Sequence, residues 1–202
     1  IVFGSGSNNT AQAVEASIKA QEMGADGLLV VTPYYNKCTQ NGLYEYYKTI
    51  SEAVHIPIIC YNVPPRTGVN ILPATMEKIA SLPNIAGVKE ACGNMEQICE
   101  TMRRIRGKCD LYSGDDNLNL PILAIGGAGL ISVASNIIPK ETKMLYDFMQ
   151  VHNLAAANEI QDRMLPLIDA MFMEVNPIPA KAAAEMIGLE GGIPRPPLTE
   201  LE

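Results

Sequence analysis

The sequence contains no tryptophan and only two histidines, and aromatic residues make up 5% of its 202 residues. Its five cysteines are scattered, without a C-x-x-C pair or the ligand spacing of a zinc site, so we expect no metal. Unpaired, scattered cysteines are typical of free thiols in a reducing compartment, which predicts a cytoplasmic protein.

An excess of positive charge and long apolar runs are also missing. Fifteen Lys and Arg against 22 Asp and Glu give a net charge of −7, which argues against nucleic acid or an anionic membrane as a partner. The most apolar stretch, Leu118 to Ile138, is broken by proline, glycine and asparagine, so it cannot form an uninterrupted membrane-spanning helix. The turn at Gly4 to Gly6 lacks the third glycine of a dinucleotide motif, and no P-loop occurs, so we expect no cofactor.

What the sequence does contain is a repeat of short apolar runs separated by helical patterns. A chain with 48% apolar residues is long enough to bury a core without disulfides. Most of the runs are continuously apolar, as in parallel strands that are covered on both faces. Six strands are expected, in Ile1–Gly4, Gly27–Thr32, Pro57–Val63, Ile85–Lys89, Cys109–Ser113 and Gly129–Val133.

Helices are expected between these strands, because apolar residues there recur every three or four positions. They are Thr10–Met23, Gly42–Val54, Pro73–Ile79, Asn94–Ile105 and Asp116–Ile125. After Pro139 the pattern becomes purely helical. We therefore predict six βα units over residues 1–138 and a C-terminal helical extension over residues 139–202.

Two α/β architectures fit six parallel βα units, an open doubly wound sheet and a part of a TIM-type (βα)8 barrel. In both, ligands bind at the carboxyl ends of the strands. Polar residues gather at these ends in this sequence, whereas the strands themselves are apolar. The sequence therefore predicts a small-molecule site at this edge of the sheet.

Lys89 is the strongest candidate for chemistry, because it lies within an apolar strand. A buried ammonium group must be paired or have a lowered pKa, and a lysine with a lowered pKa attacks carbonyl groups and forms Schiff bases. The alternative is a structural lysine paired with Glu90 or with a carboxylate of a neighbouring strand.

Three further residues at strand ends are candidates. Tyr61 and Tyr35 carry phenols that can exchange protons beside an amine, although each is equally explained as a half-buried tyrosine. Arg66 suits a carboxylate substrate, or is a solvated loop residue. Asp115 and Asp116 are expected to be helix caps rather than an acid pair.

The strand ends resemble the dihydrodipicolinate synthase (4-hydroxy-tetrahydrodipicolinate synthase) family of pyruvate-dependent class I aldolases. The resemblance covers essentially the whole chain, and its motifs occur in the family's order and spacing. The matching segments are Val31-Thr-Pro-Tyr-Tyr-Asn36, Tyr61-Asn-Val-Pro-Pro-Arg-Thr-Gly68, Gly87-Val-Lys-Glu-Ala-Cys-Gly93, Tyr112-Ser-Gly-Asp-Asp116, Gly129-Leu-Ile-Ser-Val-Ala-Ser-Asn136 and Asn176-Pro-Ile-Pro179.

This resemblance implies a role for each matching residue. Lys89 matches the lysine that forms the pyruvate Schiff base, and Tyr61 matches the tyrosine that assists proton transfer. Tyr35 matches a tyrosine that reaches into the neighbouring subunit's site, which implies a homo-oligomer. Arg66 matches the arginine that binds the carboxylate of the aldehyde. Of the remaining matches, Gly114 and Ile131 line the pyruvate pocket, and Asn8 and Tyr34 belong to a lysine-feedback site of some members.

The resemblance also implies two βα units before the segment that aligns with Ile1. The family has an eight-unit (βα)8 barrel, so the resemblance implies that this chain is a partial TIM-type barrel of six units. The two preceding units carry a G-T-T-G-E motif whose threonines bind the pyruvate carboxylate. Because the given sequence lacks this motif, we expect weak or no synthase turnover from this chain alone. The alternative function is a catalytically inactive truncated barrel that folds as an oligomer with exchanged or paired elements.

Overall fold

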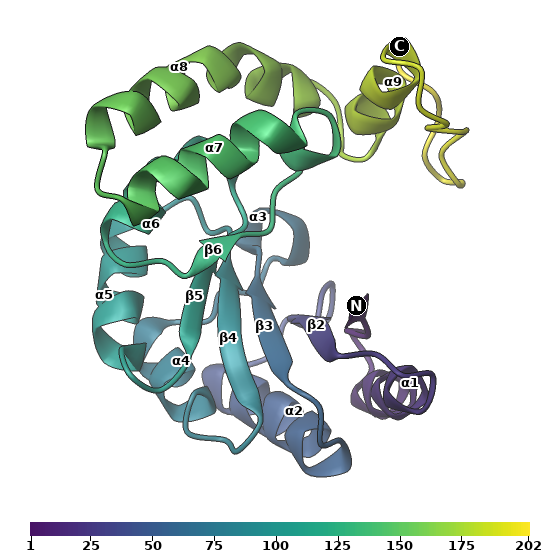
Figure 1. Ribbon diagram of the computed structural model, residues 1–202. Coiled ribbons are helices and arrows are strands. Elements are labelled where there is room, and N and C mark those ends of the chain that lie inside the picture. Colours follow the sequence, from purple (N-terminus) through teal and green to yellow (C-terminus); the bar gives the residue numbers. More distant parts are fainter. The chain divides into compact units, whose positions relative to one another are not determined.

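Six strands are hydrogen-bonded in the order in which they occur along the chain, in a computed structural model that describes residues 1–202 (Figure 1). They are β1 (Val2–Gly4), β2 (Gly27–Val31), β3 (Ile58–Asn62), β4 (Ile85–Glu90), β5 (Asp110–Ser113) and β6 (Gly129–Leu130). The strands are parallel, and their order never reverses. A doubly wound sheet has a reversal point, so the fold is the partial TIM-type barrel that the family resemblance predicted, and that prediction is confirmed.

The chain divides into two compact units. The first comprises residues 1–114 and 125–128, and the second comprises residues 115–124 and 129–202. The predicted boundary between Ile138 and Pro139 marks a change of element type, and as a domain boundary it stays a prediction.

Five helices belong to the first unit. They are α1 (Thr10–Glu22), α2 (Gln40–Ala53), α3 (Pro64–Thr67), α4 (Pro73–Ile79) and α5 (Met95–Ile105). Side chains of Asn9, Thr39 and Asn94 accept hydrogen bonds from the first turns of α1, α2 and α5. Proline begins α3 and α4, at a position where no backbone N–H is needed. The element boundaries therefore follow from local sequence signals.

The core of the first unit lies mainly on one face of the sheet, because the fully buried side chains of β2, β3 and β4 are register neighbours there, whereas Leu29, Ile59 and Tyr61 on the other face are half-buried. Leu28 and Val30 of β2 alternate with half-buried residues, and Ile58, Cys60 and Val88 are 0% exposed. In Figure 1, α4 and α5 lie along the outer side of the strands β3 to β5. The strand β1 differs, because Val2 and Phe3 remain 54% and 43% exposed.

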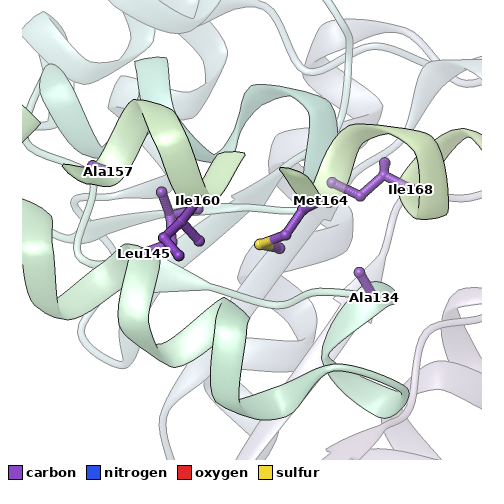
Figure 2. Close-up of a cluster of buried hydrophobic side chains, with 6 residues drawn as sticks. All are labelled: Ala134, Leu145, Ala157, Ile160, Met164 and Ile168. Carbon is purple, nitrogen blue, oxygen red and sulfur yellow. The ribbon is translucent and has the colours of Figure 1, made fainter. Parts of the chain in front are cut away.

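The second unit is mostly helical. Besides the short strand β6, its elements are the 3₁₀ turn η1 (Asp116–Leu118), α6 (Asn119–Ala124), the turn η2 (Ala134–Asn136), α7 (Pro139–Gln150), α8 (Leu154–Met171) and α9 (Ile178–Met186). The helices α7 and α8 pack side by side (Figure 1). A cluster of buried apolar side chains lies between them, and Figure 2 shows Ala134, Leu145, Ala157, Ile160, Met164 and Ile168.

Two local expectations were wrong. The strand expected over Gly129–Val133 ends at Leu130, because the carboxylate of Asp116 accepts hydrogen bonds of 2.9 Å from the backbone N–H groups of both Val133 and Ala134. Asp116 is therefore a buried anchor for this turn, whereas Asp115 caps η1 through the N–H of Asn117, as expected.

All five cysteines are free thiols. None of the helices combines the length and apolar character that crossing a lipid bilayer requires.

Met164 is a test of the buried cluster in the second unit. It is 2% exposed, so Met164→Ala removes a side chain whose space the neighbours cannot fully refill. We expect the variant to lower the free energy of unfolding by about 2–5 kcal/mol in urea titrations. The matched control Met186→Ala removes the same side chain from a position that is 78% exposed, and we expect a change within about 0.5 kcal/mol. Equal effects of the two variants would contradict the assignment of the cluster.

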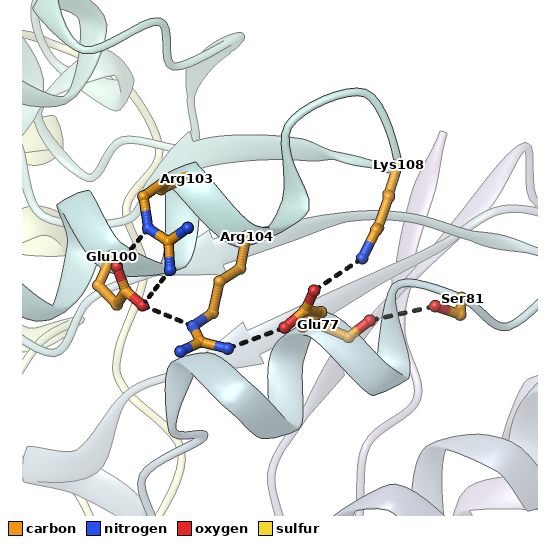
Figure 3. Close-up of polar contacts among 6 residues, drawn as sticks. All are labelled: Glu77, Ser81, Glu100, Arg103, Arg104 and Lys108. Atoms are coloured by element: carbon orange, nitrogen blue, oxygen red, sulfur yellow. Dashed lines mark hydrogen bonds and ion pairs between the residues drawn. The ribbon is translucent and has the colours of Figure 1, made fainter.

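An ion-pair network joins α4 to α5 in the first unit (Figure 3). The carboxylate of Glu77 accepts from Arg104 at 2.9 Å and from Lys108 at 3.1 Å. The carboxylate of Glu100 accepts from Arg103 at 2.7 Å and from Arg104 at 2.6 Å. Hydrogen bonds from Arg103 and Arg104 lower the pKa of Glu100 to about 2.

The lowered pKa of Glu100 sets the pH range over which this network stabilises the folded chain. The contribution is complete above the ordinary value of 4.5 and is lost as the pH falls towards 2. We therefore expect Glu100→Gln to have a lower Tm than the parent at pH 7, and the difference in Tm to shrink progressively below pH 4.5. Salt at 1 M should shrink the same difference at pH 7, because these side chains are partly exposed. A difference that grows on acidification would refute this account.

Candidate active site

The pairing of β3 with β4 brings Lys89 and Tyr61 together. The two residues are direct neighbours in the parallel register, and their side chains therefore lie on the same face of the sheet. The Nζ atom of Lys89 is 4.2 Å from the centroid of the Tyr61 ring. Lys89 is 9% exposed, so a cation–π contact is formed where little water competes.

Gly114, which follows β5, packs directly against the stem of Lys89. A Cβ atom added at Gly114 would lie 2.7 Å from Cε and 2.8 Å from Cγ of Lys89. Real contacts are never this short, so any larger residue must displace the lysine. The sequence did not predict this contact between Gly114 and Lys89. The resemblance had assigned Gly114 only to the lining of the substrate pocket.

Asn62 and Glu90 face the other side of the same two strands. They are neighbours in the register, and Asn62 donates to the two carboxylate oxygens of Glu90 at 3.0 and 3.1 Å. The N–H of Cys92 donates to the same carboxylate at 2.9 Å. Burial raises the pKa of Glu90, and the hydrogen bonds from Asn62 and Cys92 partly offset this effect. Alternation of side chains along a strand separates Glu90 from the face that carries Lys89.

Arg66 and Tyr35 occupy exposed positions on the segments that follow β3 and β2. Arg66 lies in the short helix α3, which the sequence pattern had indicated as a loop. Two prolines begin this helix, and Gly68 ends it with φ of 72°, which glycine adopts without strain. Tyr35 is 90% exposed and has φ of 70°, an unusual backbone conformation for an aromatic residue.

Thr32 and Thr67 form a contact that sequence reasoning missed. Thr32, at the end of β2, donates to the hydroxyl of Thr67 at 3.1 Å, and both are buried. Thr67 also donates to the carbonyl of Val69 at 3.0 Å. These bonds fix the end of α3, and with it the position from which Arg66 extends.

The remaining predicted site residues lie in separate places. The carbonyl of Asn8 accepts from Asn36 at 2.9 Å, which joins this loop to the segment that carries the 40% exposed Tyr34. Ile131 is half-buried and follows β6 in the second unit. No group of three or more His, Cys, Asp or Glu side chains able to hold a metal ion occurs in residues 1–202.

Comparison with known proteins places this geometry in a family. The sequence profile of the Dihydrodipicolinate synthetase family matches residues 1–202. The chain belongs to the dihydrodipicolinate synthetase family. The 4-hydroxy-tetrahydrodipicolinate synthase of Caldicellulosiruptor bescii is 52% identical over 201 residues, which are 100% of this chain and 68% of that protein.

Solved structures of the dihydrodipicolinate synthetase family are similar throughout this chain. The chloride-inhibited dihydrodipicolinate synthase from Acinetobacter baumannii, complexed with pyruvate, is 41% identical with a TM-score of 0.96, over 100% of this chain and 69% of that one. The enzyme from Cyanidioschyzon merolae with lysine bound is 42% identical with a TM-score of 0.96, over 100% of this chain and 68% of that one.

The packing of Gly114 against Lys89 can be tested by substitution. We expect Gly114→Ala to lower the free energy of unfolding by about 1–3 kcal/mol, because it overpacks the space occupied by Lys89. A crystal structure of the variant should show the Nζ atom beyond about 6 Å from the Tyr61 ring. The matched control is Gly4→Ala, because no atom lies within 4 Å of a Cβ atom added there. An unmoved lysine in Gly114→Ala would contradict the packing described.

Proposed function

We propose that this chain is a pyruvate-dependent aldolase in which Lys89 forms a Schiff base with pyruvate. The observation that carries the proposal is the position of Lys89, 9% exposed at the carboxyl end of β4 and 4.2 Å from the Tyr61 ring centroid. The names of its relatives support the full reaction, the condensation of pyruvate with aspartate semialdehyde in lysine and diaminopimelate biosynthesis.

The first chemical step needs an amine and a group that handles protons. The ammonium group of Lys89 first gives a proton to water. The resulting neutral amine attacks the C2 carbonyl of pyruvate and forms a carbinolamine, which takes up a proton and loses water to give the protonated imine. Tyr61 is the proton donor and acceptor that we assign to these steps, because its ring already contacts Nζ. Loss of a proton from the pyruvate methyl group then gives the enamine that attacks the aldehyde.

The other residues are assigned roles around this centre. Arg66, exposed on α3, binds the carboxylate of the aldehyde as a charged, bidentate partner. Gly114 lines the pyruvate pocket, a role supported by its close packing against the stem of Lys89. Tyr35 extends to the site of a second copy in a homo-oligomer, and its 90% exposure with a left-handed backbone supports this role.

A lysine-feedback site at Asn8 and Tyr34 is the remaining part of the proposal. Its support is the hydrogen bond from Asn36 to the carbonyl of Asn8, which joins the two segments, and the lysine-bound relative from Cyanidioschyzon merolae.

Borohydride trapping tests the Schiff base directly. Incubation of the chain with pyruvate and sodium borohydride should add one reduced pyruvate, and peptide mapping should place it on Lys89. We expect no adduct on Lys89→Ala under the same conditions. Circular dichroism establishes that both proteins are folded.

An adduct at another lysine would contradict the assignment of Lys89. No adduct on the folded parent chain would favour the alternative, a catalytically inactive barrel segment.

A further inference from the structure

We propose that Glu90 is a positioning residue for the reaction, which holds the ends of β3 and β4 so that Lys89 stays over Tyr61. The inference rests on the proposed Schiff-base function of Lys89. It concerns the face of the sheet opposite to the site, so Glu90 and its partners do not contact the reacting groups.

The argument begins with the register of the two strands. Tyr61 pairs with Lys89, and the next pair along the same ladder is Asn62 with Glu90. One pair faces the site and the other faces the helices, one residue further along the chain. A change of a few tenths of an ångström at the second pair is therefore transmitted through a single peptide unit to the first.

The contacts of Glu90 are unusually complete for the end of a strand. Asn62 donates to both oxygens, at 3.0 and 3.1 Å, and Cys92 donates through its backbone N–H at 2.9 Å. Glu90 is 1% exposed and Asn62 is 0% exposed. Buried hydrogen bonds to a charged group are stronger than neutral ones and are costly to break.

A wider amide network fixes Asn62 in turn. Its Oδ1 atom accepts from the N–H of Ile71 at 2.9 Å, and its Nδ2 atom also donates to Asn70 at 2.9 Å. Asn70 and Gln97 of α5 exchange hydrogen bonds of 2.7 and 3.0 Å. The carboxylate thus ties together β3, β4, α5 and the segment that follows α3.

Glu90→Gln is the sharpest change, because it keeps the shape and replaces one carboxylate oxygen by an NH₂ group. That group would oppose the donating Nδ2 atom of Asn62 at about 3.1 Å, so two donors would face each other and the strand ends would separate. At saturating pyruvate, we expect the rate at which the borohydride-trapped adduct forms in a single turnover to fall roughly 10- to 100-fold. Small displacements of a reacting group have effects of this size. The pyruvate concentration for half-maximal trapping should change little.

The double variant Asn62→Asp with Glu90→Gln tests the pairing itself. The introduced glutamine amide then donates to the introduced aspartate, so the hydrogen bond is restored with its direction reversed. We expect this variant to recover part of the trapping rate lost in Glu90→Gln and not all of it, because Asn62→Asp also removes the donor to Asn70 at 2.9 Å.

Asn84→Asp is the matched control, at the opposite end of β4. Asn84 donates to the carbonyls of Ser51, Val54 and Ile56, so a carboxylate there disrupts a comparable partly buried amide network. It should lower Tm without lowering the trapping rate at a temperature well below Tm. A purely structural role for Glu90 would give Glu90→Gln this same result, and would overturn the inference.

The outcomes separate the two proposals. If the parent chain forms no adduct on Lys89, the proposed function has failed. If the parent forms the adduct and Glu90→Gln traps pyruvate at the parental rate, the positioning role has failed.

Discussion

The burial of the Lys89 ammonium group against the ring of Tyr61 is the interaction on which the site depends. A charged group that is 9% exposed needs compensation, and the face of an aromatic ring 4.2 Å away supplies part of it. The two side chains meet because β3 and β4 are parallel neighbours in the register that pairs them. That register also places Asn62 beside Glu90 on the opposite face. The end of one strand pair thus carries a cation on one face and a hydrogen-bonded buried carboxyl group on the other.

A glycine and two threonines pack around the ends of β3 and β4 and fix the positions of neighbouring side chains. Gly114 leaves only enough room for the stem of Lys89, and a Cβ atom would remove that room. The bond between Thr32 and Thr67 fixes the short helix that presents Arg66. These contacts are local to the first unit. Its outer helices are joined by the Glu77 and Glu100 ion pairs, and the second unit has its own apolar cluster between α7 and α8.

Membership of the dihydrodipicolinate synthetase family agrees with this arrangement, because the family profile matches every residue of the chain. The chain spans about 68% of the length of the Caldicellulosiruptor bescii relative. Within that length, the carboxyl ends of β3 and β4 and the segment after β5 bring Lys89 into contact with Tyr61 and Gly114. Tyr35 and Arg66, on the segments that follow β2 and β3, are both exposed.

The sequence by itself determined the order of strands and helices, because apolar runs, capping residues and prolines act over a few positions. It also singled out Lys89, since a lysine within an apolar strand is expensive unless it has a function or a partner. The local pattern alone fitted both a barrel and a doubly wound sheet, because both use the same βα units, and the resemblance of the strand-end motifs to a known family decided for the barrel. Only the tertiary structure decided the strand order, the shortening of β6 by Asp116 and the opposite faces of Lys89 and Glu90. Each of these depends on hydrogen bonds between residues far apart in the chain, and no local pattern records which distant groups will pair.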